Sequence, residues 1–237
     1  MIHPLFKWFG TKWSASKRKS YPPPDGRDIY EPFAGCAGYS LIYCESQVTI
    51  WESNPLLLDL WDWIIHHATE ALVREIPINL PFGIDIRTLG LTRGQELLLK
   101  HWQRTNNYGN CWTVSPWGNK PGQWTENTRV RVSEEIQAVK HWRLTPVDYC
   151  DVGLYFIDPP YQYNYDYGVK DFSYEALKSW VSIVPSGSRI IACEAVCPKT
   201  GKVPDYFPFV PSHSQVTSRR KKEENHHSKE LIWVEDR

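Results

Sequence analysis

The residues best suited to chemistry follow an apolar segment in the second half of the chain. Leu154–Ile157 runs directly into Asp158-Pro159-Pro160-Tyr161. The two prolines fix φ and remove two backbone donors, so the turn is rigid and its carbonyls stay free to accept hydrogen bonds. The Asp158 carboxylate and the Pro159 carbonyl match the two N–H groups of an exocyclic amine, and the Tyr161 ring can stack on a base. This pattern predicts a site for an amino-bearing nucleobase.

Two patterns nearer the N-terminus indicate a nucleoside cofactor. Glu31-Pro32-Phe33-Ala34-Gly35 stands where a predicted strand gives way to a helix, and small residues at such a turn let the backbone approach a ligand closely. Glu52 ends the next apolar segment, 17 residues after Gly35. A carboxylate at that position can accept hydrogen bonds from both ribose hydroxyls.

In this order, the three patterns resemble the DNA adenine-N6 methyltransferases of the Dam type, and the resemblance covers essentially the whole chain. Phe6–Lys12 looks like the family's N-terminal K-W-x-G-G-K, Glu31–Gly35 like its E-P-F-x-G loop, and Trp51–Asn54 like its acid-x-N. Asp158–Tyr161 matches the catalytic motif without change, and Glu230–Trp233 looks like the closing strand.

The sequence departs from the family at two glycine positions. Thr11 stands where the family has a glycine, and Ala37 where the second glycine of F-x-G-x-G usually lies, with Gly38 one step later. These departures leave open a non-catalytic nucleic-acid-binding or anti-restriction protein on the same scaffold. Methylation of cytosine N4 or of an RNA base also stays open, because the acceptor pair fits any exocyclic amine. A nicotinamide-dependent dehydrogenase is a distant third, since Asp-Pro-Pro-Tyr has no role there.

The resemblance implies methyl transfer from S-adenosylmethionine to adenine N6 in double-stranded DNA, with the target base flipped out of the helix. It implies no metal. The catalytic residues would be Asp158, Pro159, Pro160 and Tyr161. The cofactor-binding residues would be Trp8, Gly10, Lys12, Phe33, Ala34, Gly35, Glu52 and Asp158.

The charges are balanced overall but unevenly distributed. Residues 1–30 hold six Lys or Arg against two acids, and residues 187–222 hold seven against two. The rest of the chain holds 14 bases and 23 acids, so the 27 of each sign cancel. Two basic clusters suit a polyanion contacted on one face, although clusters near chain ends are as often solvated surface. The predicted DNA contacts are Asn107, Lys120, Arg220, Lys221 and Lys222.

Apolar segments alternate with helical patterns toward both ends of the chain, which predicts an α/β fold with a doubly wound, mostly parallel sheet. We expect a Rossmann-like methyltransferase domain over residues 1–83 and 147–237, with an inserted target-recognition segment over 84–146. The predicted helices are Pro55–Arg74, Glu96–Arg104, one opened by Ser133 and ending near Trp142, and Tyr174–Ile183. The predicted strands are Asp28–Phe33, Val48–Glu52, Gly153–Asp158, Arg189–Glu194, Val216–Arg219 and Glu230–Glu235.

The composition further limits the classes of protein to which the chain can belong. With 237 residues, 41% of them apolar, the chain can bury a real core. Its longest apolar stretch, Leu56–Ile65, is broken by Asp59 and Asp62 and falls short of the ~20 residues needed to cross a bilayer. No secretory signal is visible, and the six cysteines form no C-x-x-C pair, which argues against a zinc site or disulfide framework. We expect a cytoplasmic protein, monomeric, with no membrane partner.

Overall fold

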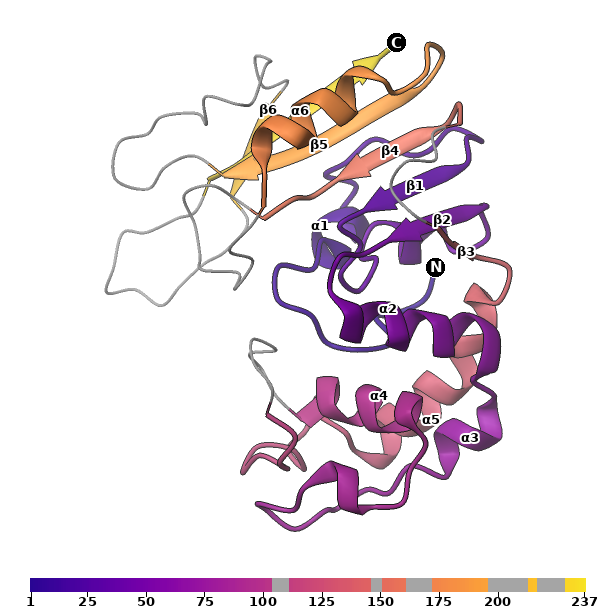
Figure 1. The fold of residues 1–237 in the computed structure, drawn as a ribbon, viewed down its shortest axis with the longest axis vertical. Helices are drawn as coiled ribbons and strands as arrows, with labels where there is room; N and C mark the ends of the chain where they lie inside the picture. Colours follow the sequence, from indigo (N-terminus) through magenta and orange to yellow (C-terminus); the bar gives the residue numbers. More distant parts are fainter. Residues whose placement is uncertain (104–110, 146–150, 161–171, 196–212, 217–228) are drawn as a thin grey trace.

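The computed structural model describes residues 1–103, 111–145, 151–160, 172–195, 213–216 and 229–237. A seven-stranded sheet in the order β3-β2-β1-β4-β5-β7-β6 forms its frame (Figure 1). The strands are β1 Ile29–Pro32, β2 Val48–Trp51, β3 Arg143–Leu144, β4 Leu154–Ile157, β5 Arg189–Ala195, β6 His213–Val216 and β7 Lys229–Asp236.

The sheet is mostly parallel, which confirms the predicted α/β class. Strands β1 to β5 run parallel to one another, whereas β7 pairs antiparallel with both β5 and β6. All four residues of β1 and of β4 are buried, as expected for strands covered on both faces. The chain leaves β1 toward β2 and β3, then returns to place β4 on the other side of β1. This reversal between β1 and β4 is the position at which open α/β sheets bind ligands.

Helices cover the sheet and form a second group beyond α2 (Figure 1). Helix α2 packs on α4, and α3 packs on α5, so these helices extend the core away from the sheet. Buried residues of the sheet and of the segment 84–146 belong to one continuous hydrophobic cluster. The helices are α1 Trp13–Lys17, α2 Pro55–Asp62, α3 Glu70–Arg74, α4 Arg93–Gln103, α5 Glu126–Glu135 and α6 Tyr174–Ser182. The described residues also form a π-helical segment, Trp63–His67, and the 3-10 turns Ser40–Tyr43, Ile86–Thr88 and Ile136–Val139.

The predicted helices differ from the structure in their bounds. Helix α4 begins at Arg93 rather than Glu96, and α6 ends at Ser182 rather than Ile183. The single helix expected over Pro55–Arg74 is interrupted, because Ala68 is extended and the Thr69 side chain caps α3 by accepting from the Leu72 N–H. The helix expected to open at Ser133 already begins at Glu126. The Ser133 hydroxyl donates to the Val130 carbonyl inside that helix instead of capping its start.

The strand predictions need two corrections. The strand expected over Val216–Arg219 is β6, His213–Val216, and residues 217–219 lie outside the described part. Strand β3 was not predicted at all, since Arg143–Leu144 is only two residues long and carries no apolar run. It lies inside the segment 84–146, so that segment contributes to the sheet. The division of the chain at 83/84 and 146/147 stays a prediction.

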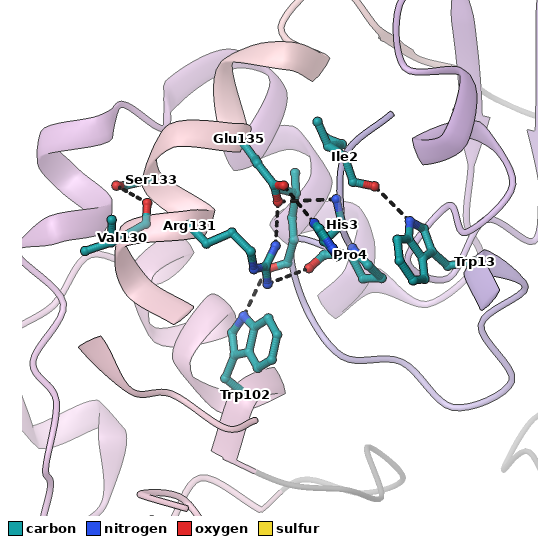
Figure 2. A network of polar contacts seen from close by, with 10 residues as sticks. Ile2, His3, Pro4, Trp13, Trp102, Val130, Arg131, Ser133 and Glu135 are labelled. Atoms are coloured by element: carbon teal, nitrogen blue, oxygen red, sulfur yellow. Dashed lines mark hydrogen bonds and ion pairs between the residues drawn. The ribbon is translucent and has the colours of Figure 1, made fainter. Parts of the chain in front are cut away.

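Hydrogen bonds hold the N-terminal segment against helix α5 (Figure 2). His3 Nδ1 lies 2.9 Å from Glu135 Oε1, and Arg131 Nη1 donates to Glu135 Oε2 at 2.5 Å. The other end of the Arg131 guanidinium donates to the Pro4 carbonyl at 3.2 Å. At the other end of the segment, Trp13 donates from Nε1 to the Ile2 carbonyl. The residues between Pro4 and Trp13 are therefore positioned from both ends.

Candidate active site

The candidate site lies where β1, β2 and β4 end. Pro32 at the end of β1 pairs with Trp51 at the end of β2, and β4 runs parallel on the other side of β1. In Figure 1 the arrowheads of these strands point to the same side of the molecule. The segments that follow β1, β2 and β4, predicted to carry chemistry from the sequence alone, therefore meet at one edge of the sheet.

The turn after β1 is tight and closely covered. Phe33 and Gly35 both have left-handed backbone conformations, with φ of 61° and 52°. The Ala34 N–H donates to the Trp51 carbonyl at 3.1 Å, which ties the turn to β2. A Cβ built on Gly35 would lie 2.4 Å from Trp8 Cδ1, so the indole packs directly on the glycine backbone. The structure thus brings together Trp8 and the turn 33–35, as the sequence predicts.

The two departures from the family's glycine pattern are accommodated in this turn. Ala37 itself adopts a left-handed conformation, with φ of 52°. Gly38 supplies the close approach instead, since a Cβ there would lie 2.6 Å from both Thr11 Oγ1 and the Trp13 backbone nitrogen. Thr11 Oγ1 also accepts from the Trp13 N–H at 3.3 Å. The N-terminal segment and the turn therefore fit each other without the two missing glycines.

Glu52 is a buried acceptor at the end of β2. Its Oε2 accepts from the Gly35 N–H at 3.0 Å, and its Oε1 accepts from the N–H groups of Ser53 at 2.8 Å and Asn54 at 3.0 Å. Burial raises the pKa of this carboxyl, while the backbone hydrogen bonds act in the opposite direction. A carboxylate has about four acceptor positions. Oε1 also accepts from the Ser53 hydroxyl at 3.5 Å, so its positions are filled, and only Oε2 keeps one position, enough for one ribose hydroxyl rather than two.

Lys12 and Asp158 form an ion pair in the centre of the site. Lys12 Nζ lies 2.7 Å from Asp158 Oδ2, and the two side chains are 10% and 20% exposed. The same ammonium donates to the Gly10 carbonyl at 3.1 Å, and Gly10 has a left-handed φ of 80°. The predicted cofactor residues Gly10 and Lys12 are thus joined to the predicted catalytic Asp158, although Lys12 lies 146 residues from it in sequence.

A second buried carboxyl, Glu31, lies on β1 behind this pair. Its Oε2 accepts from the backbone N–H of Ser40 at 3.0 Å and from the Ser40 hydroxyl. Burial raises the pKa of Glu31 to about 7, with the hydrogen bonds from Ser40 opposing and the negative charge of Asp158 adding to the shift. The sequence shows Glu31 only as part of a motif. A carboxyl inside a fully buried strand is the signal that could have marked it as a separate titrating group.

Tyr174 on α6 supports the proline turn, and the sequence analysis did not identify it. Its hydroxyl donates to the Pro160 carbonyl at 2.8 Å. Burial is the main cause that raises the pKa of Tyr174 to about 12, so the hydroxyl stays protonated and remains a donor at neutral pH. Phe172, next to α6, meets the ring of Phe33 edge to face at 5.4 Å. The first residue of α6 therefore holds the proline turn, and Phe172, two residues before the helix, packs on the turn after β1.

Several predicted residues cannot be placed in this site. Lys120 lies on the connection between α4 and α5, with Nζ 3.8 Å from the ring centre of Trp117, whose side chain is 58% exposed. The remaining predictions fall outside the described residues; they are Tyr161, Asn107, Arg220, Lys221 and Lys222.

The arrangement offers a hydrogen-bond acceptor, a buried cation and an aromatic side chain, Trp8, at one sheet edge. Among the described residues, no three His, Cys, Asp or Glu side chains gather as a metal site. No helix in the described part of the chain is both long and apolar enough to cross a membrane. No family model matches this sequence, and no curated protein matches it.

Proposed function

We propose that this protein transfers a methyl group from S-adenosylmethionine to the N6 amino group of adenine in double-stranded DNA. The observation that carries the proposal is the position of Asp158. It follows β4 at the reversal point of the sheet, beside the turn of β1, and its carboxylate holds a cationic N–H donor at 2.7 Å. A carboxylate that already binds one nitrogen donor is suited to bind the amino group of a base.

The residues around the turn of β1 fit a nucleoside cofactor. Gly35 lets the Trp8 indole pack directly against the backbone, which gives the turn an aromatic wall. Glu52 retains one acceptor position for a ribose hydroxyl. S-adenosylmethionine supplies an electrophilic methyl group when bound. The other residues proposed to hold it are Gly10, Lys12, Phe33, Ala34 and Asp158.

The proline turn would orient the amino group. Asp158 and the Pro159 carbonyl would each accept one N–H, which directs the nitrogen lone pair away from both acceptors. Tyr174 keeps the turn in place through the Pro160 carbonyl. Positioning of this kind supplies much of the rate of a transfer between two bound groups. No covalent intermediate on the protein is needed.

An adenine within a duplex cannot reach a sheet edge, so the proposed reaction requires base flipping. Flipping costs a few kcal/mol, and stacking on Tyr161 would offset it by about 1–3 kcal/mol. Lysine and arginine side chains of the basic clusters, together with Lys120 and Asn107, would contact the DNA backbone.

Methyl transfer with tritiated cofactor tests the proposal directly. The full chain is incubated with unmethylated duplex DNA, single-stranded DNA or RNA, and the labelled nucleosides are separated. We expect label in N6-methyl-2′-deoxyadenosine from duplex DNA. Asp158→Ala should lower the rate by at least about 10²-fold, the typical cost of losing one positioned polar group. Asp151→Ala, just before the start of the same strand, is the matched control and should keep the wild-type rate.

Other outcomes would replace the proposal with a specific alternative. Label in N4-methylcytosine or in an RNA nucleoside would change the substrate but keep the chemistry. Absence of label in every substrate, with DNA still bound, would favour the non-catalytic binding protein. Retention of more than about a tenth of the activity in Asp158→Ala would remove Asp158 from the catalytic residues.

A further inference from the structure

We infer that Lys12 competes with the positive charge of the methyl donor for Asp158, so that the chain distinguishes the charged donor from its uncharged product. The inference rests on the proposed function and concerns the state of the site before and after transfer. Its basis is that Asp158 is already neutralised by a cation from the chain itself.

The ion pair is well placed to act in this way. The Lys12 ammonium is held by two oxygens, Asp158 Oδ2 at 2.7 Å and the Gly10 carbonyl at 3.1 Å. Lys12 is only 10% exposed, so water screens the pair weakly. Removing one member of a buried pair leaves the other charge uncompensated, which is strongly unfavourable. Asp158 therefore favours the presence of one cation beside it.

A second cation must enter the same place during the proposed reaction. The methyl group has to reach the nitrogen that Asp158 holds, so the sulfonium that carries it must also lie near Asp158. Two positive charges beside one partly buried carboxylate repel each other. Lys12 can relieve this repulsion by leaving Asp158 while it keeps its hydrogen bond to Gly10. Its departure also frees Oδ2 to accept the amino group of the base.

The opposite holds once the methyl group is transferred. The product S-adenosylhomocysteine carries a neutral thioether, so it brings no cation to Asp158, and Lys12 can return to the carboxylate. Glu31 also favours a cation beside Asp158, because its carboxyl is buried close enough to interact with Asp158. Lys12 thus disfavours the donor relative to the product, while Asp158 favours the donor.

Calorimetry of the full chain with S-adenosylmethionine and S-adenosylhomocysteine tests this inference without measuring activity. The quantity measured is the ratio of the two dissociation constants. Lys12→Met should shift the ratio toward the donor by about tenfold or more, the range for a hydrogen bond to a charged group. Asp158→Asn should shift it in the opposite direction, and Lys12→Arg, which keeps the charge, should stay close to wild type. Lys17→Met is the matched control, a lysine of α1 lying over the Trp13 ring at 4.9 Å, and should leave the ratio unchanged.

The possible results separate this inference from the proposed function. If wild type binds both ligands and neither Lys12→Met nor Asp158→Asn changes the ratio, the inference is wrong and the proposed function stands. If wild type binds neither ligand, the proposed function fails and the inference fails with it. Thermal melting of each variant shows whether it folds. Should Lys12→Met not fold, Asp158→Asn and Lys12→Arg still decide the matter, because the inference requires the first to shift the ratio toward the product and the second to leave it unchanged.

Discussion

The indole ring of Trp8 occupies the space that any side chain at residue 35 would need. A Cβ on Gly35 would lie 2.4 Å from Trp8 Cδ1 and 2.7 Å from Trp8 Nε1. On its other side, the Gly35 carbonyl accepts from the Trp61 Nε1–H at 2.8 Å. The N-terminal segment and the turn after β1 are therefore built against each other, and glycine at this position is required by packing as well as by its φ of 52°.

Gly35→Ala should destabilise the fold and disturb the site. The new Cβ would force the Trp8 ring to move, and a left-handed residue with a Cβ costs a further ~1–2 kcal/mol. Together we expect a loss of about 2–5 kcal/mol in the free energy of unfolding, since overpacking alone typically costs about 1–3 kcal/mol. Urea denaturation followed by tryptophan fluorescence measures this loss.

Gly26→Ala separates the cost of the left-handed backbone from the cost of the contact with Trp8. Gly26 also has a left-handed φ, 78°, but a Cβ there meets nothing within 4 Å. Gly26→Ala should therefore lose only the part of the free energy of unfolding that a left-handed residue with a Cβ costs. In addition, Trp8→Ala combined with Gly35→Ala should recover part of the loss. Equal effects of Gly35→Ala and Gly26→Ala would mean that Trp8 does not confine residue 35.

Replacement of Glu52 by alanine should weaken the fold even without cofactor. Three backbone N–H groups, those of Gly35, Ser53 and Asn54, would lose the acceptor they share. Hydrogen bonds to a charged group contribute about 1.5–3 kcal/mol each, so we expect a stability loss of at least that size. Cofactor affinity should fall as well, because the turn that Glu52 holds would loosen.

Thermal melting and calorimetry of the Glu52 variant, each with Glu45→Ala as the control, check this prediction. Glu45 is an exposed acid shortly before β2, at the opposite end of the strand from Glu52. An unchanged melting temperature together with weaker cofactor binding would show that Glu52 acts on the ligand alone. Unchanged values of both would show that another group holds the turn.

The sequence was sufficient to predict the parts of the fold that depend on local patterns. Short runs rich in Val, Ile and Tyr became β1, β2, β4 and β5, and the cap residue Ser173 opens α6 by accepting from the Ala176 N–H. Strand β3 could not be found in this way, because two residues carry no periodicity and its pairing with β2 depends on tertiary contacts. The break at Ala68 was missed because the apolar pattern continues through it.

For the site, sequence reasoning identified which residues would meet but not what they do to each other. Lys12 was expected to bind cofactor and Asp158 to bind the base; their mutual ion pair depends on a distance that no local pattern encodes. The same is true of Glu52, whose acceptor positions are mostly occupied by neighbouring backbone groups. Tyr174 was missed because a tyrosine in the first turn of a helix looks like any packing residue.

Glu31 should make the stability of the chain depend on pH near neutrality. Its pKa is raised from 4.5 to about 7 in the folded chain, chiefly by burial. The folded state therefore binds more protons than the unfolded state between these values, so the contribution of Glu31 is fully present below pH 4.5 and is lost as the pH rises to about 7. His101 acts in the opposite direction, because burial lowers its pKa to about 3 and its contribution grows as the pH rises toward 6.5.

Comparison of Glu31→Gln with wild type isolates the first effect, since His101 is common to both. Glutamine keeps an oxygen that can accept from Ser40 but cannot ionise. The stability of Glu31→Gln relative to wild type should therefore increase between pH 4.5 and 7, by up to about 3 kcal/mol, and level off above that range. Urea titrations at half-unit pH steps measure the difference, with the exposed Glu75→Gln as the control, for which we expect no such trend. A difference that stays constant with pH would mean that Glu31 is already ionised throughout this range, with its charge stabilised by the hydrogen bonds from Ser40.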